Sequence, residues 1–487
     1  MRTSSNLLTR AFLLAQSILF SVALVACNGS EATLAITPTS NPPDVTSSPT
    51  QRPAATEAAP TTAPAETAQA TGTLGVEEES LHGLHIRYWY TGSLDYKKAV
   101  DNRVRVFNAS PQAGIWIEPS YFGSAGEMMD RIKLVSADQR PDLVLTYPAL
   151  TGEWPRLGIE TVDLEPYIHD PTWGFLSEEL KNFPANLFSS SYSDGLAGFP
   201  GYRVADLLFY NQTWAEELGF SAHPPTTPQE FQVQACEAAK ANQKSKDPTK
   251  TGTGGWIAAN SPEVVLSWIG AFGGKDPVSE NFRFQNDAAN QALAFLKAMF
   301  DKGCAWVARN PDPSVYFANR QALFFSGTSA DFNSIDTALA NNKSKDLWKA
   351  IPYPGQSRSP VIYGAGPDYY ILKSSPERQL AAWKFIHWMS QAENQAVAAD
   401  TSGIFPTRTL TPDELPQDLK KNLNWYDAFK MLNILRQMPG APEWVTIGPI
   451  LQDAAGQLFQ TSTKPDQVSS ILDMLDRTIQ EVVSRNP

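Results

Sequence analysis

The stretch from Gly195 to Phe231 constrains the fold more than any other part of the chain. It opens with a cluster of residues that stop a helix and let the backbone turn sharply: Gly195, Gly198, Pro200 and Gly201. Ala205–Tyr210 is a short apolar run with the pattern of a buried strand. Trp214–Leu218 predicts a short helix closed by Gly219, and Thr227 can cap a second helix through 229–240. The stretch therefore predicts a turn, a buried strand and two helices.

This order of elements resembles the family 1 extracellular solute-binding proteins, the carbohydrate receptors related to maltose-binding protein. In that family the segment carries the chain from the first lobe into the second. The matching residues are Phe199, Pro200, Leu208, Tyr210, Asn211, Leu218, Gly219, Pro225, Thr227, Glu230 and Phe231. The tryptophan that usually precedes the glutamate is missing, and 202–206 is specific to this chain.

Later segments are similar to the same family at 315–332 and 362–408. In the first, Asn319 stands where the family usually has glycine, a substitution that still supports a turn. The resemblance spans roughly 84–483 and implies an α/β, two-lobe periplasmic-binding-protein fold, type II-like, with hinge crossings between the lobes and a C-terminal helical region. We expect lobe 1 to comprise 82–198 and 366–415, and lobe 2 to comprise 199–365 and 416–487. In the tail we expect helices over 425–436, 449–461 and 465–483.

The segment after residue 84 alternates between strand and helix patterns. Strands are predicted at 85–90, 114–119 and 142–146, with helices at 97–108 and 128–135 between them. This order indicates a parallel sheet with right-handed crossovers. Ligands on such sheets bind beyond the carboxyl ends of the strands. We therefore expect Trp89, Tyr90, Ser124 and Tyr147 at the edge of a cleft.

The amino terminus has the pattern of an export signal, which we place at 1–26. Arg2 and Arg10 flank an apolar run that is shorter than the ~20 residues needed to span a bilayer. Leu24-Val25-Ala26-Cys27 looks like a bacterial lipobox, which would make Cys27 the acylated first residue. The alternative is an ordinary signal peptide with an incidental cysteine. Residues 27–81 are rich in Thr, Pro, Ala and Ser and predict a disordered tether.

The net charge bears on the kind of partner, and the cysteines bear on the cross-links that the chain can form. Removing the signal peptide would take the formal net charge from −12 to −14, which argues against nucleic acid as a partner. If Cys27 is lipidated, Cys236 and Cys304 remain as an even pair in an oxidising compartment, and we predict a disulfide between them. The alternative is two buried free thiols.

Other candidate ligand contacts come from aromatic and charged residues near the predicted cleft. Aromatic rings stack on the apolar faces of sugars, and charged groups bond their hydroxyls. These candidates are Tyr202, Arg203, Asp206, Trp256, Trp268, Asp331, Asp368 and Trp444. Core packing is the alternative for the tryptophans. Arg203 and Asp206 could pair with each other, either for ligand or as a salt bridge that locks the two lobes.

Enzyme motifs are absent from the sequence. It contains no Gly-x-Ser-x-Gly and no His-Glu-x-x-His. We expect no catalytic residue, no metal site and no cofactor. The prediction is a monomeric, lipid-anchored binding protein on the extracytoplasmic face of the cell membrane, delivering a sugar or oligosaccharide to the transmembrane subunits of an ABC permease. Two alternatives stay open: a receptor for a membrane sensor, and a secreted glycoside hydrolase.

Overall fold

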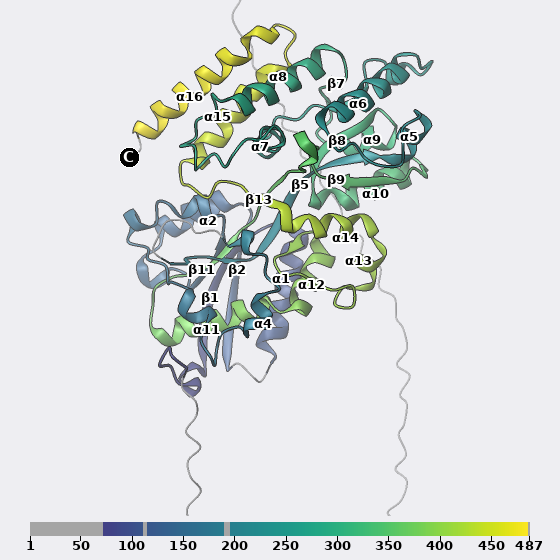
Figure 1. Ribbon diagram of the computed structural model, residues 1–487. Helices are drawn as coiled ribbons and strands as arrows, with labels where there is room; N and C mark the ends of the chain where they lie inside the picture. The colour runs from purple at the N-terminus through teal and green to yellow at the C-terminus, as the bar shows by residue number, and fades with distance from the viewer. Residues whose placement is uncertain (1–71, 111–113, 189–194, 486–487) are drawn as a thin grey trace, which may run out of the picture. The chain divides into compact units, whose positions relative to one another are not determined.

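The computed structural model describes residues 72–110, 114–188 and 195–485. The expected signal peptide, Cys27 and most of the expected tether lie outside these ranges. Figure 1 shows helices arranged around two β-sheets. The α/β fold expected from the sequence is confirmed.

The first sheet has five strands within the described residues, in the order β2–β1–β3–β11–β4. They are β2 (Ile115–Phe122), β1 (Leu84–Thr91), β3 (Leu143–Thr146), β11 (Asp368–Ile371) and β4 (Phe199–Pro200). β1 pairs in parallel with β2 and β3, as the alternating pattern predicted. β11 is antiparallel to β3 and β4, so a distant part of the chain completes this sheet.

Helices cover both faces of the first sheet. Tyr88 and Tyr90 of β1 lie in a core with α1 (Leu94–Asn108) and α11 (Pro376–Met389). Trp89 points to the opposite face, where it packs with α2 (Ala125–Leu134). This alternation follows from the period of two along a strand. The remaining helices of this region are α3 (Glu165–Ile168), α4 (Ser177–Leu180) and α12 (Ala392–Ser402).

The second sheet has eight strands within the described part of the chain, built around β5 (Tyr202–Asn211). The main path runs β13–β10–β5–β8–β6–β7, and β9 and β12 also pair with β5. These strands are β6 (Gly254–Ile257), β7 (Ala305–Trp306), β8 (Ala322–Thr328), β9 (Trp348–Ile351), β10 (Ile362–Ala365), β12 (Phe405–Pro406) and β13 (Leu435–Gln437). β5 follows β4 almost directly, so it carries the chain from the first sheet into the second.

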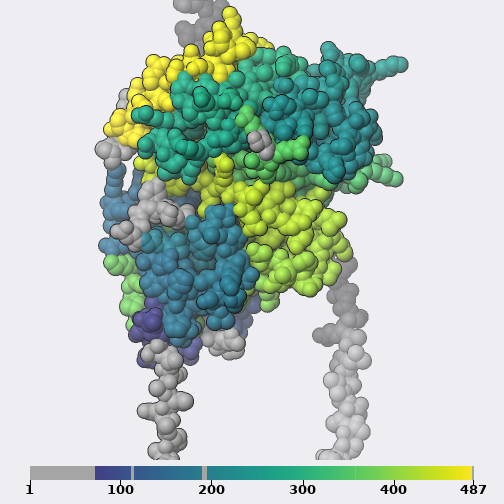
Figure 2. All heavy atoms as spheres, viewed as in Figure 1, coloured from purple at the N-terminus to yellow at the C-terminus, as the bar shows by residue number. Residues whose placement is uncertain are grey.

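Helices also cover both faces of the second sheet. One core contains side chains of α6 (Pro228–Gln243), α7 (Pro262–Ala271), α8 (Asp287–Asp301), α15 (Trp444–Gly456) and α16 (Val468–Arg485). The other contains side chains of α9 (Pro313–Ala318), α10 (Phe332–Asn341), α13 (Gln417–Lys421) and α14 (Leu423–Phe429). The short α5 (Gln212–Glu217) follows β5. In Figure 2 the yellow C-terminal residues lie against the teal and green surface of this region, in line with the packing of α16 on α8 and α15.

Several helices and segments begin or end at other residues than the sequence predicted. The helix expected over 425–436 ends at Phe429, and the chain continues through a 3-10 turn into β13. β13 pairs with β10, so backbone pairing in the sheet overrides the local helical pattern. The helix expected from Pro449 begins at Trp444 instead. The tether was expected to reach residue 81, but Val76 and Leu81 are buried in the first-sheet core, so 72–81 belong to the folded body.

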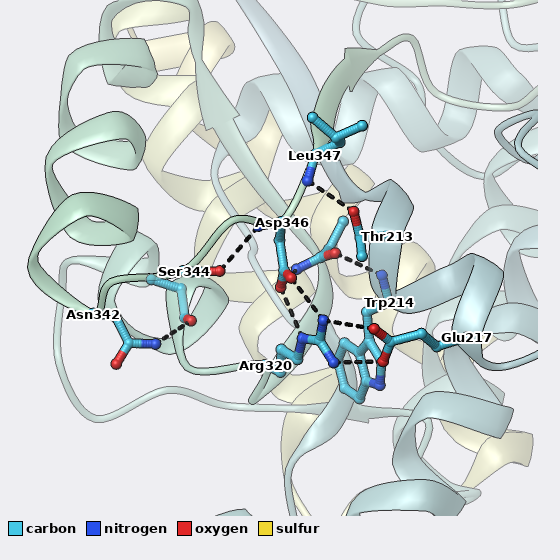
Figure 3. A network of polar contacts seen from close by, with 10 residues as sticks. Thr213, Trp214, Glu217, Arg320, Asn342, Ser344, Asp346 and Leu347 are labelled. Atoms are coloured by element: carbon cyan, nitrogen blue, oxygen red, sulfur yellow. Dashed lines mark hydrogen bonds and ion pairs between the residues drawn. The ribbon is translucent and has the colours of Figure 1, made fainter.

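Arg320 adopts a left-handed backbone conformation with φ 52°. We expected the turn to depend on Asn319, but Asn319 has an ordinary φ of −88°. A non-glycine residue in this conformation costs on the order of 1–3 kcal/mol. Figure 3 shows what offsets this cost: the Arg320 guanidinium lies between the carboxylates of Glu217 and Asp346, each with an oxygen 2.6 Å away. The two ion pairs join α5 to the segment before β9.

The predicted disulfide is confirmed. Cys236 of α6 and Cys304 are bonded; they are 68 positions apart in the sequence, and their Cα atoms are 4.4 Å apart. The bond joins α6 to the strand edge at β7, across the core of the second sheet region. Within the described residues, no helix is long and apolar enough to cross a membrane.

Replacing both cysteines, Cys236→Ser with Cys304→Ser, should lower the free energy of unfolding by about 2–5 kcal/mol, because the unfolded chain gains freedom when the cross-link is lost. Urea unfolding followed by tryptophan fluorescence measures the change. The wild type unfolded in reducing buffer is the control and should match the double variant. Equal urea midpoints for the oxidised wild type and the variant would contradict the prediction.

Candidate functional site

Two of the segments that cross between the sheets meet at a buried ion pair. β5 leaves the first sheet after β4, and β11 returns to it after β10. Nη2 of Arg203 on β5 lies 2.8 Å from Oδ1 of Asp368 on β11, and the two side chains are 0% and 1% exposed. Arg203 also donates hydrogen bonds to the carbonyl oxygens of Tyr202 and Leu187. The ion pair therefore joins both crossings.

The sequence left open whether Arg203 pairs with Asp206. In a strand, residues 203 and 206 point to opposite faces of the sheet, so Arg203 cannot reach Asp206 and pairs with Asp368 instead. Both Arg203 and Asp368 were expected at the ligand. In this structure they are almost fully buried and bonded to each other, so the pair holds the two crossings together, and their expected contact with a ligand stays a prediction.

A cavity of about 330 Å³ lies between residues of the two sheet regions. Its lining residues are Thr91, Gly92, Ser93, Tyr96, Ala125, Tyr147, Tyr202, Val204, Ala330, Ser402 and Ile404. Thr91 ends β1, and Tyr147 follows β3 directly. Ala125 begins α2, shortly after β2. The cavity thus lies beyond the carboxyl ends of the parallel strands, where ligands bind on such sheets.

Tyr147 and Tyr202 are the two predicted site residues that line this cavity. Tyr147 belongs to the first-sheet region, Tyr202 begins β5, and their hydroxyl groups are hydrogen-bonded to each other. Burial raises the pKa of Tyr147 and raises the pKa of Tyr202 well above the usual range. Both hydroxyls are therefore protonated at neutral pH. The Tyr202 ring also packs against Tyr96, with ring centroids 4.5 Å apart.

Asp206 is on the same strand as Tyr202 and Val204 but is not among the residues that line this cavity. It shares one face of β5 with Tyr202 and Val204, and it pairs across the sheet with Thr328, two residues before Ala330. Its side chain is buried, and the hydroxyl groups of Tyr353 and Ser267 lie within hydrogen-bond reach of its carboxyl group. Burial raises the pKa of Asp206 well above its ordinary value, and the nearby carboxylates of Glu263 and Asp331 raise it further.

The other predicted aromatic contacts are mostly core residues. Trp256 and Trp268 are fully buried in the core of the second sheet region, with centroids 6.0 Å apart, so neither offers a face to a ligand. Tyr90 is also fully buried, and its hydroxyl donates to Asp101. Trp89 packs on α2 against Phe122. In this structure all four residues pack in the core, and their expected place at a ligand stays a prediction.

The remaining predicted residues are more exposed but lie outside the cavity lining. Ser124 caps α2 by accepting a hydrogen bond from Glu127 N. The Asp331 carboxylate accepts hydrogen bonds from the backbone and hydroxyl of Thr328. Trp444 is half-buried and stacks on Phe282, with centroids 6.2 Å apart. Ser124 and Asp331 each precede or follow a lining residue in the sequence, namely Ala125 and Ala330.

Two other cavities are lined by residues that were not predicted as site residues. One of about 600 Å³ is lined by Trp173, Trp388 and His387 on the first-sheet region, away from the crossings. Another of about 760 Å³ is lined by residues that include Tyr363 and Arg436. Neither includes a predicted site residue. In the part of the chain that the structure describes, no group of three or more His, Cys, Asp or Glu side chains could hold a metal ion.

The chain has the sequence pattern of a known protein family. Residues 102–423 match the family model of the bacterial extracellular solute-binding proteins. The chain belongs to this family. It is therefore a binding protein and not an enzyme, and its family is extracytoplasmic. This solute-binding protein matches no curated protein sequence.

Solved structures with the same fold include several receptors. The sugar-binding protein MalE from Xanthomonas citri is 20% identical, with a TM-score of 0.68, covering 82% of this chain and 98% of the other. The cyclic alpha-maltosyl-1,6-maltose binding protein from Arthrobacter globiformis is 14% identical, with a TM-score of 0.67, covering 81% and 98%. UgpB from Mycobacterium tuberculosis, solved with glycerophosphocholine, is 18% identical, with a TM-score of 0.63, covering 82% and 98%. These likenesses confirm the expected periplasmic-binding-protein fold.

Sequence reasoning missed several lining residues of this solute-binding protein. Thr91 and Ser93 directly follow the predicted first strand, so the same strand-end rule could have found them. Val204 is adjacent to Arg203 and could have been chosen by its place after the crossing. Ser402 and Ile404 come from the end of α12 and have no local signal, because only the tertiary fold brings them to the cavity.

Asp368→Asn should lower the free energy of unfolding by about 3–5 kcal/mol, because it leaves the buried Arg203 charge without a counter-charge while preserving shape. Thermal or urea unfolding measures the loss. The matched control is Glu160→Gln, which removes a carboxylate paired with Lys373 at 2.6 Å but 65% exposed, and which should change stability little. Similar small effects for both variants would show that the buried pair is not important for stability.

Proposed function

We propose that this solute-binding protein is the extracytoplasmic substrate-binding lipoprotein of an ABC importer. It binds a sugar or oligosaccharide between the two sheet regions and delivers it to the transmembrane subunits of the permease. The observation that carries this proposal is the cavity at the carboxyl ends of β1 and β3, which combines tyrosine rings with hydroxyl groups. Rings stack on the apolar faces of sugars, while hydroxyl groups exchange hydrogen bonds with them.

The compared structures support a carbohydrate as the solute. The proteins from Xanthomonas citri and Arthrobacter globiformis bind sugar and a cyclic maltosyl-maltose, as their names state. UgpB was solved with glycerophosphocholine, so the same fold also takes other solutes. The lining of this chain's cavity favours the first group, since none of its described residues is charged.

The two lobes of the proposed receptor are residues 82–198 with 366–415, and 199–365 with 416–487. Because β5 and β10–β11 join them through short crossings, small backbone changes at these crossings can open and close the cleft. A ligand that binds the closed form more tightly shifts the population toward it. The closed form would then dock on the permease as a monomer. Tyr147 and Tyr202 are the ligand contacts that this proposal retains from the sequence, with Ser124, Asp331 and Trp444 at the rim.

The anchor of the proposed receptor is a lipid on Cys27, at the end of a tether that reaches to about residue 71. A lipobox at the predicted cleavage site and a tether poor in large apolar residues support this part of the proposal. The anchor would hold the receptor close to its permease, and the tether would let it reach the permease entrance.

Incubation with a panel of mono-, di- and oligosaccharides should raise the unfolding midpoint of the purified chain for at least one member. A ligand that binds only the folded state, present at 100 times its Kd, stabilises that state by about 2.7 kcal/mol. Differential scanning fluorimetry measures the shift, and product analysis of the same mixtures tests for hydrolysis. A panel without any shift, or the appearance of cleavage products, would overturn the proposal.

Cys27→Ala should move the expressed protein out of the membrane fraction, because a lipid anchor can form only on that thiol. Fractionation and detergent phase partition of the wild type and the variant measure the change. The Cys236→Ser and Cys304→Ser double variant is the control, and it should stay with the membrane. Equal membrane association of the wild type and the Cys27 variant would show that the lipobox interpretation is wrong.

A further inference from the structure

A close contact outside the crossings joins the two sheet regions. Gly152 directly follows the 3-10 turn η3 (Pro148–Thr151) in the first-sheet region, and Pro442 lies shortly before α15, which packs in the second-sheet core. A Cβ built on Gly152 would lie 2.1 Å from Cγ and 2.3 Å from Cβ of Pro442, far inside van der Waals contact. In this arrangement only glycine fits at position 152.

This glycine is needed for space and not for backbone conformation. Gly152 has φ −61° and ψ −25°, right-handed helical values that residues with a side chain adopt without strain. The three nearest atoms that a Cβ would meet all belong to Pro442. Apart from its chain neighbours, no atom of the first-sheet region would come closer than 3.4 Å, an ordinary contact distance. The restriction on position 152 therefore comes from the second-sheet region.

Both partners of the contact are held firmly by their own regions. Beside Gly152, Trp154 is 2% exposed and packs edge-on against Tyr370 of β11, with ring centroids 5.4 Å apart. Beside Pro442, Ala441 is buried in the second-sheet core. The proline ring itself fixes φ at position 442. Because neither partner can move aside, the contact limits how closely the two regions approach each other.

The segment that carries Gly152 also carries a residue of the cavity wall. Tyr147 lines the cavity between the sheet regions, and η3 follows it directly. The Leu150 N–H donates a hydrogen bond to the Tyr147 carbonyl oxygen, which holds the turn together. One hydrogen-bonded turn thus connects the cavity wall to the contact. The distance between Gly152 and Pro442 and the width of the cavity therefore change together.

Pro442 also completes a cavity of about 600 Å³ in the first-sheet region. The lining includes Trp154, Gly198 and Tyr370 of that region. Among the described lining residues, Pro442 is the one that comes from the second-sheet region. This cavity is therefore covered only where the two regions meet.

We infer that the contact between Gly152 and Pro442 is the stop that sets how far the two proposed lobes close, and that glycine at position 152 thereby determines ligand affinity. This inference rests on the proposed function and adds the residue pair that fixes the geometry of the closed form. A side chain at position 152 would hold the cavity walls, with Tyr147 and Tyr202, further apart.

Disulfide trapping tests the contact without a ligand. Gly152→Cys combined with Pro442→Cys should form an intramolecular cross-link in diamide, because the two Cβ atoms need to move apart by only about 1–2 Å to reach disulfide geometry. The matched control is Glu79→Cys with Pro442→Cys. It should not cross-link, since Glu79 precedes β1 and lies at the opposite end of the first sheet from Gly152. A folded Gly152 and Pro442 double variant that does not cross-link would overturn the inference.

Small-angle X-ray scattering of the same double variant distinguishes a contact that closes from one that is permanent. The reduced protein should have a larger radius of gyration than the cross-linked protein, because its two regions can separate. Equal radii for the two forms would show that the contact is a fixed part of the fold, and the inference would then be wrong.

Affinity tests the role of the glycine. Isothermal titration with the saccharide that gives the largest unfolding shift in the panel should show about five- to hundredfold weaker binding to Gly152→Ala, the range expected for overpacking a close contact. The unfolding midpoint without sugar should equal that of the wild type, because the open form has room for the methyl group. The matched control is Gly126→Ala, whose Cβ would meet its nearest neighbour, Ser124 Oγ, at 3.9 Å, and its affinity should be unchanged.

Wild-type affinity in Gly152→Ala would contradict the inference and leave the proposed function standing. A panel without any binding saccharide would overturn the proposed function instead. The cross-linking and scattering results would still decide whether the contact between Gly152 and Pro442 limits closure.

Discussion

The buried ion pair of Arg203 and Asp368 is the contact on which the arrangement of the two sheets depends. Removing two charges from water is costly, and only close pairing with further hydrogen bonds offsets that cost. Arg203 meets both conditions, with Asp368 and the carbonyl oxygens of Tyr202 and Leu187 as acceptors. If β5 shifted relative to β11, Arg203 and Asp368 would each be buried without the other's opposite charge. The pair therefore selects one alignment of β5 against β11.

Close backbone packing reinforces this alignment. Gly366 lies so near the Tyr202 carbonyl oxygen that a Cβ would collide with it. Thr407, which follows β12, donates to the carbonyl oxygen of Pro200. Three separate parts of the chain thus meet within a few residues of the ion pair, and their positions are mutually dependent.

The same alignment builds the cavity. Once Arg203 points to the ion pair, strand geometry sends Tyr202 and Val204 to the other face of β5, where they line the cavity, and places Asp206 beside them. Tyr147, at the end of β3, then lies within hydrogen-bond reach of Tyr202. The ion pair and the cavity wall consequently lie on two faces of one strand.

The sequence alone determined the elements that depend on local pattern: the strand–helix order after residue 84, the strand after the glycine cluster, the Thr227 cap, and the pairing of Cys236 with Cys304. It also placed candidate contacts near strand ends, and one of them, Tyr147, lines the cavity. Only the tertiary structure decided which aromatic residues are core, as for Trp256 and Trp268, and that 435–437 is a strand. It also brought Ser402 and Ile404 to the cavity. Burial and sheet pairing depend on contacts between residues that are far apart in the chain, and a local sequence pattern does not show which distant residues come into contact.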